Sequence, residues 1–119
     1  MALHSEEISF TTDGSGDATV YSSGVSGRIH RIKYGKGDMG GSTNLTITSE
    51  THTDSIFAMA VGATDRDMYP RVALVGNTGV ALTAPAYDHY IVQSDDRLKV
   101  VIDTGGATKT GSVTIFYEA

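Results

Sequence analysis

The sequence contains no cysteine and no tryptophan, only two prolines, and fewer basic than acidic residues. The absence of cysteine excludes disulfide bonds, thiolate zinc sites and cysteine nucleophiles together. The formal net charge is -5, from 9 Lys and Arg against 14 Asp and Glu. A nucleic-acid-binding face needs clustered basic side chains, so we expect no direct nucleic-acid partner.

Long hydrophobic runs are also missing. No apolar run approaches the roughly 20 residues that a membrane-spanning helix needs. The first residues, "MALHSEEISF", lack the basic region and apolar stretch of a secretory signal. We therefore expect a soluble product that is made and kept inside the cell, without membrane contact.

The residues that are present favour strands. Fourteen glycines, with many Thr, Ser and Val, are typical of short strands joined by tight turns. Apolar and polar residues alternate along many segments, as the opposite faces of a strand require. Ile8 and Phe10 share one face of a first strand, "DGSGD" at Asp13–Asp17 predicts a tight turn, and "ATVYSS" predicts the return strand of a hairpin.

About eight or nine such strands follow one another without a helical pattern. So many strands must protect their edges, and a sandwich, a jelly roll or a barrel does so. We predict an all-β fold, a single antiparallel β-sandwich domain of jelly-roll-like type over residues 1–119, with a short N-terminal arm at about residues 1–5. Within it, "SIFAMAVG" at Ser55–Gly62 is apolar on both faces, which predicts a central strand or one buried at a subunit interface.

The C-terminal stretch, "DRLKVVIDTGGATKTGSVTIFYEA", reads as two alternating runs around a glycine-rich turn. This pattern predicts a terminal β-hairpin, in which Val101 and Phe116 point outward. The inward residues are Leu98, Val100, Ile102, Val113, Ile115 and Tyr117.

Asp13, Ser15 and Asp17 have the alternate spacing with which a calcium-binding loop begins. The glutamate that such a loop supplies at its twelfth position is replaced by Gly24. A hairpin turn accounts for the same residues without a cation, and both interpretations stay open at this point.

No other motif indicates catalysis. The four histidines form no metal-binding pair in sequence, and the neighbours Asp88 and His89 would face opposite sides of a strand. We therefore predict no catalytic residue, no cofactor site and no metal site, and we do not expect an enzyme.

Aromatic, methionine and arginine side chains in irregular or doubly apolar segments are typical of protein–protein contacts. They gather in "ATDRDMYPR" and in "SIFAMAVG". For the first segment, a solvated crossover loop held by Pro70 is the alternative. The candidate interface residues are Phe57, Met59, Val61, Arg66, Met68, Tyr69, Arg71, Val101 and Phe116.

A resemblance adds to these patterns. From about Ile8 to Glu118 the chain resembles small structural proteins encoded among the head genes of tailed bacteriophages. The segments that carry the resemblance, in order, are "FTTDGSGDATVY", "GRIHRIKYGKGD", "NLTITSE", "MYPRVAL" and "DRLKVVIDTGGATKTGSVTIFYE".

The resemblance implies a virion structural protein, a capsid decoration or cement protein made in the host bacterial cytoplasm. Such a protein binds the major capsid protein lattice at the outer capsid surface and forms a homo-oligomer, a trimer or a dimer. One alternative is a phage tail or head-tail connector component. Another is a carbohydrate-binding β-sandwich module that presents tyrosines to sugar rings, for which the chain offers Tyr21, Tyr34, Tyr69, Tyr87 and Tyr90.

Overall fold

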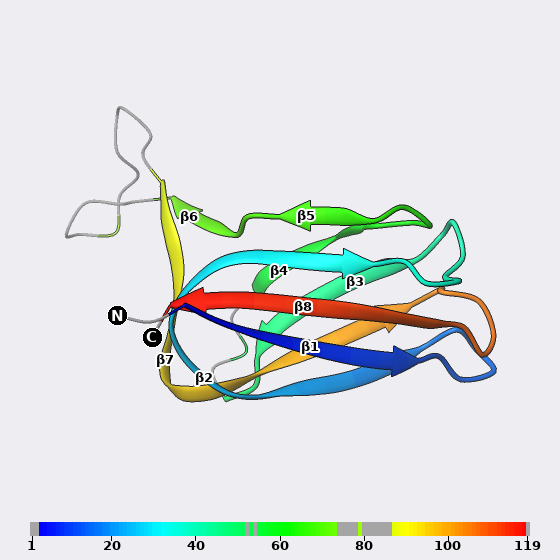
Figure 1. The fold of residues 1–119 in the computed structure, drawn as a ribbon, viewed down its shortest axis with the longest axis horizontal. Coiled ribbons are helices and arrows are strands. Elements are labelled where there is room, and N and C mark those ends of the chain that lie inside the picture. The colour runs from blue at the N-terminus through cyan, green and yellow to red at the C-terminus, as the bar shows by residue number, and fades with distance from the viewer. Residues whose placement is uncertain (1–2, 52, 54, 74–78, 80–86, 119) are drawn as a thin grey trace.

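The computed structural model describes residues 3–51, 53, 55–73, 79 and 87–118. All regular structure in these residues is β, in agreement with the predicted class (Figure 1). The strands are β1 (Leu3–Thr11), β2 (Ala18–Gly35), β3 (Asn44–Ser49), β4 (Ser55–Ala60), β5 (Arg66–Met68), β6 (Arg71–Ala73), β7 (Tyr87–Asp103) and β8 (Thr110–Glu118).

The strands form two packed layers that share two long strands (Figure 1). The layer that we call the β8 sheet contains β1, β8, the second half of β2 and β5, in this order. The layer that we call the β3 sheet contains the first half of β2, the second half of β7, β3 and β4. All of these pairs are antiparallel, so the predicted β-sandwich is confirmed, and the arrangement is compatible with a jelly roll.

The long strands β2 and β7 turn the corner between the two layers. β2 pairs with β7 from Ala18, and with β8 from Arg28 to Gly35. The register shifts between Tyr21 and Gly24 and again between Val25 and Gly27, and such bulges let a strand bend from one sheet into the other. On the other side of the corner, the start of β7 pairs with β6 in a short antiparallel ladder.

One apolar core lies between the layers, built from the side chains that alternate inward along both sheets. Tyr34 is its largest fully buried side chain, and its hydroxyl donates to the carbonyl of Gly62 at 3.0 Å. Burial raises the pKa of this hydroxyl. The other fully buried members are Val25, Ile29, Ile32, Leu45, Ile47, Val61, Leu98, Val100, Ile102, Val113 and Ile115.

Both predicted hairpins are wrong. β1 pairs with β8 instead of β2, and β7 pairs with β2 and β3 instead of β8. In each case the turn carries the chain from one sheet to the other across the core. The predicted inward faces are nevertheless confirmed, because a hairpin and a sheet-to-sheet crossing bury the same alternate residues. Of the predicted inward residues of β8, Val113 and Ile115 are buried and Tyr117 is half-buried.

Two further predictions need correction. β4 is an edge strand that pairs only with β3 among the described strands, and its last three residues are exposed, so it is not a central strand. The predicted arm at residues 1–5 is wrong for Leu3–Ser5, because these residues pair with the end of β8. Met1 and Ala2 lie outside the described residues.

The turns that connect the layers bind one another at one end of the sandwich. The Gly105 N–H donates to the Gly16 carbonyl at 2.9 Å, and the Gly40 N–H donates to the Gly105 carbonyl at 3.0 Å. The buried Thr12 hydroxyl adds a bond of 2.6 Å to the Gly106 carbonyl. At the opposite end lie the start of β1, the end of β8, and β6 (Figure 1).

Candidate functional site

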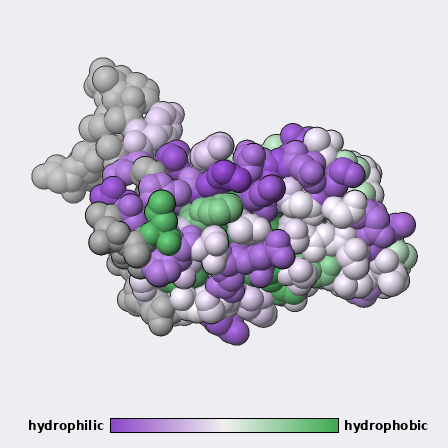
Figure 2. Space-filling model, in the orientation of Figure 1, coloured by the Kyte–Doolittle hydropathy of each residue, from purple (hydrophilic) through white to green (hydrophobic). Residues whose placement is uncertain are grey.

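A groove of about 420 Å³ opens on the outer face of the β8 sheet, at the end that holds the start of β1 and the end of β8. Hydrophobic surface interrupts hydrophilic surface toward this end of the face (Figure 2). We call this feature the terminal groove. It is lined by Leu3, His4, His30, Arg31, Tyr69, Arg71, Phe116 and Glu118.

The strand register brings Phe116 to the middle of the groove. Phe116 lies opposite Ser5 on one side and Arg31 on the other, and neighbours that face each other across strands point to the same side. The guanidinium of Arg31 lies 4.6 Å from the centre of the Phe116 ring, and its Nε lies 3.2 Å from Oδ1 of Asp67. This cation–π contact and ion pair hold an aromatic surface in place at the groove.

Arg71 supplies a cation at the same groove. Its Nη1 donates to the Pro70 carbonyl at 2.7 Å and to the His30 carbonyl at 3.4 Å. Within the described part of the chain it forms no ion pair with a carboxylate. The remaining guanidinium N–H groups can therefore bind a carboxylate of a partner.

Two histidines complete the groove. His30 Nε2 lies 3.6 Å from Oε2 of Glu118, and the His4 ring stacks on Tyr117 with 5.2 Å between ring centres. The groove thus combines aromatic, aliphatic and cationic groups. This composition suits recognition of an acidic and apolar protein surface.

The structure brings together three of the residues that the sequence predicted as interface, Tyr69, Arg71 and Phe116. Val101 is half-buried in the β3 sheet, opposite Thr46, and is therefore not part of this groove. Arg66 is exposed, and its Nε donates to the Val61 carbonyl at 2.7 Å.

Two of the predicted interface residues are wrong. Val61 is fully buried and Met68 is buried in the core, so neither side chain is available to a partner. Val61 directly follows β4. At this point the N–H groups of Val61 and Gly62 both donate to the Thr43 carbonyl, and the chain turns inward. The other two residues of that apolar run, Phe57 and Met59, stay partly accessible at the edge of the sandwich.

Sequence reasoning missed most of the groove. Leu3 and Glu118 come from opposite ends of the chain and face each other only through the β1–β8 register. No local signal in the sequence indicated that Arg31 meets Phe116 across the strands.

In the Asp13–Asp17 turn, the Asp13 carboxylate accepts hydrogen bonds from the backbone of the turn itself. Oδ1 of Asp13 accepts the N–H groups of Ser15 at 2.8 Å and Asp17 at 3.1 Å. The bonds from Asp17 and then Ser15 lower the pKa of Asp13. Three or more metal-ligating side chains do not converge anywhere among the described residues, and His52 lies outside them.

The tyrosines considered for sugar binding do not form one platform. Tyr34 is buried in the core, and the Arg97 guanidinium lies 4.4 Å from the ring centre of Tyr21. Tyr69 and Tyr87 are exposed, and the side chain of Tyr90 lies outside the described residues.

Comparisons with known proteins identify no family. No family model matches the chain. No curated protein matches it either. Among solved structures, the chain is similar to the Yersinia pseudotuberculosis-derived mitogen, with a TM-score of 0.46 and 10% identity over 98% of this chain and 88% of that chain. A helix with the length and apolar character to cross a membrane does not occur in the described ranges.

Proposed function

We propose that the chain is a bacteriophage virion structural protein, a decoration protein that binds the major capsid protein lattice on the outer surface of the head. The ordered resemblance to small phage head proteins supports this assignment. The terminal groove and its surroundings supply the surface for such a contact.

The observation that carries the proposal is the clustering of exposed apolar side chains at one end of the sandwich. Of the six large hydrophobic residues that are exposed in the described part of the chain, four lie on elements at this end: Leu3 in β1, Tyr69 before β6, Val72 in β6 and Tyr87 at the start of β7. Exposed aromatic and aliphatic groups beside arginines are typical of the anchors of protein interfaces. A groove that also contains Arg31 and Arg71 therefore suits a protein partner.

The physical role follows from linkage. A protein that binds only the assembled lattice stabilises that lattice by mass action, because its binding free energy is absent from the dissociated subunits. Contacts across a junction between subunits need an interface of about 1,000 Å² or more.

The test is co-sedimentation of the purified protein with heads assembled from the major capsid protein of a phage that encodes this chain. We expect binding to expanded heads, and we expect Tyr69→Ala and Arg71→Ala each to weaken it by about tenfold or more, as interface anchors do. Tyr21→Ala is the matched control, because Tyr21 is an exposed tyrosine beside an arginine on the other sheet.

Loss of binding in the control to the same degree would contradict the role of the groove. Absence of binding to any head form would contradict decoration. Mass spectrometry of separated heads and tails from the virion then decides between the head and a tail or connector location.

A further inference from the structure

Among the described strands, the two sheets have four edges, which we call margins, and three of these margins are protected. Glu6 joins the margins of β1 and the first half of β2, since its carboxylate accepts the Ser23 N–H at 2.9 Å and the Ser23 hydroxyl at 2.5 Å. β5 has only three residues, of which Arg66 and Asp67 are charged. Short length, charge and covering contacts are the usual means by which proteins prevent pairing at sheet edges.

β4 forms the fourth margin and has none of these features. It has six residues, "SIFAMA", without charge or proline, and among the described strands it pairs only with β3. The exposed side chains along it are Ser55, Ala58, Met59 and Ala60. An uncharged edge of this length presents unpaired N–H and C=O groups to any extended strand.

The register also leaves apolar side chains uncovered at this margin. Phe57 lies opposite Ile47, and Met59 lies opposite Leu45, so both point toward the core side of the β3 sheet. Met59 is nevertheless 42% exposed. A further strand beside β4 would cover these groups.

We propose that β4 pairs antiparallel with β4 of a second copy of this chain, with the two-fold axis at Ala58. This register places Ala58 against Ala58, and it places Phe57 of each copy against Met59 of the other. The strand is self-complementary in size, because a small residue stands between two large ones. The two β3 sheets then form one continuous sheet across the axis.

We identify the partner as a second copy of the chain because β4 is complementary to itself in symmetry, in charge and in side-chain contacts. Isologous pairing of an edge is closed, so it forms a dimer and no filament. No charged residue lies between Ser55 and Ala60, so like charges do not meet across the paired strands. Each Phe57–Met59 contact joins an aromatic ring to a thioether, a favourable combination that the symmetry provides twice. The inference concerns β4 alone and does not depend on the capsid role.

The first test measures mass in solution by light scattering and sedimentation. We expect twice the 12.5 kDa monomer mass for the natural chain. Ala58→Lys places two like charges opposite each other at the axis, and we expect it to raise the dimer dissociation constant by about tenfold or more. Ser9→Lys is the control, since Ser9 is also exposed on an edge strand, β1, and Lys there leaves β4 unchanged. A monomer at micromolar concentration, or a dimer that only Ser9→Lys disrupts, overturns the proposal.

The second test determines the register. Because the chain has no cysteine, a single introduced thiol can bond only to its copy. Residues opposite each other in antiparallel strands have Cα atoms about 4.5–5.5 Å apart, within reach of a disulfide. We expect Ala58→Cys to form a covalent dimer under mild oxidation and Ala60→Cys not to, because the two copies of residue 60 would be roughly 14 Å apart. Crosslinking of Ala60→Cys and not of Ala58→Cys would rule out this register.

Discussion

Gly16 shows how one backbone conformation lets two connecting turns touch. Its φ of 83° lies in the left-handed region, which favours glycine. Its carbonyl accepts the Gly105 N–H, and a Cβ on Gly16 would lie 2.9 Å from the Gly106 nitrogen. Both the conformation and the close approach require the absence of a side chain.

We predict that Gly16→Ala destabilises the protein by about 1–3 kcal/mol, the usual cost of a non-glycine residue held in a disfavoured conformation. Gly14→Ala in the same turn is the control, because no heavy atom lies within 4 Å of its added Cβ. Urea unfolding followed by fluorescence measures both free energies. Equal effects of the two substitutions would contradict this explanation.

Asp38 links the turn after β2 to the start of β8. Its Oδ1 accepts the Thr110 N–H at 2.6 Å and the Thr110 hydroxyl at 3.2 Å. The backbone bond is the main cause that lowers the pKa of Asp38 below its ordinary value of 3.8. The carboxylate therefore stabilises the fold fully above pH 3.8, and this contribution is lost as the pH falls through the lower pKa of the folded state.

We predict that Asp38→Asn lowers the unfolding midpoint at neutral pH, and that the difference from the natural chain shrinks as the pH falls below 3.8. Thermal unfolding over a series of acidic buffers measures this difference. A difference that stays constant through this range would show that the Asp38 charge does not matter.

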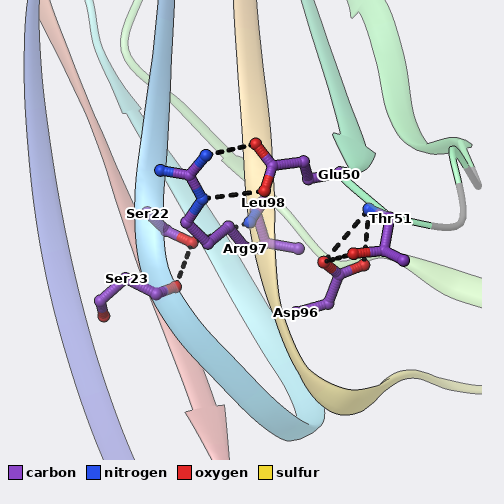
Figure 3. A network of polar contacts seen from close by, with 7 residues as sticks. All are labelled: Ser22, Ser23, Glu50, Thr51, Asp96, Arg97 and Leu98. Atoms are coloured by element: carbon purple, nitrogen blue, oxygen red, sulfur yellow. Dashed lines mark hydrogen bonds and ion pairs between the residues drawn. The ribbon is translucent and has the colours of Figure 1, made fainter.

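At the scale of elements, the bulges of β2 are held by polar contacts (Figure 3). The buried Ser22 hydroxyl accepts the Leu98 N–H at 2.9 Å and donates to the Ser23 carbonyl at 2.7 Å. On the same stretch of β7, Arg97 forms two hydrogen bonds with Glu50, which lower the pKa of that carboxyl. Ser22 therefore restores a ladder bond that the bulge would otherwise interrupt.

We predict that Ser22→Ala destabilises the protein by about 1–3 kcal/mol, because it leaves the buried Leu98 N–H without its acceptor. Ser9→Ala, at an exposed position of β1, should change the free energy of unfolding by less than about 0.5 kcal/mol. Amide hydrogen exchange at Leu98 gives a local readout. Unchanged protection of this amide in Ser22→Ala would contradict the assigned role.

The sequence predicts which face of each strand is buried far better than it predicts which strands pair with one another. Alternation identifies Val100, Ile102, Val113 and Ile115 as buried, and all four are. It assigns β7 and β8 to one hairpin, although they lie in different sheets, because period two records only which side faces an apolar environment. The glycine-rich turn between them is compatible with both connections.

The sequence predicts which types of residue form the candidate site, but it does not predict that they come together in one groove. Tyr69, Arg71 and Phe116 were recognised as anchors by their chemistry, and they share a groove. Met68 belongs to the same segment, but it lies opposite Ile32 and is buried with it. That pairing joins positions far apart in sequence, and no local pattern contains it.

At the scale of the whole molecule, the last strand of the chain lies in the interior of a sheet. β8 is placed between β1 and β2, and Leu3 lies opposite Glu118. Folding must therefore join β1 and β8, which lie far apart in the sequence, and the entropy of closing such a loop slows folding. Circular permutation can change the order of the strands along the chain and so test this effect on folding.

We predict that a circular permutant refolds about tenfold faster or more, because it converts the β8–β1 pairing into a local hairpin. The permutant joins Ala119 to Met1 through a short Gly-Ser linker and opens the chain beside the exposed Ala107. Stopped-flow refolding measures the rate, and circular dichroism verifies the β structure. A second permutant, opened beside the exposed Gly41, has the same joined ends and separates their effect from that of the opening. Two folded permutants that refold no faster than the natural chain would show that the β1–β8 pairing forms after the rate-limiting step.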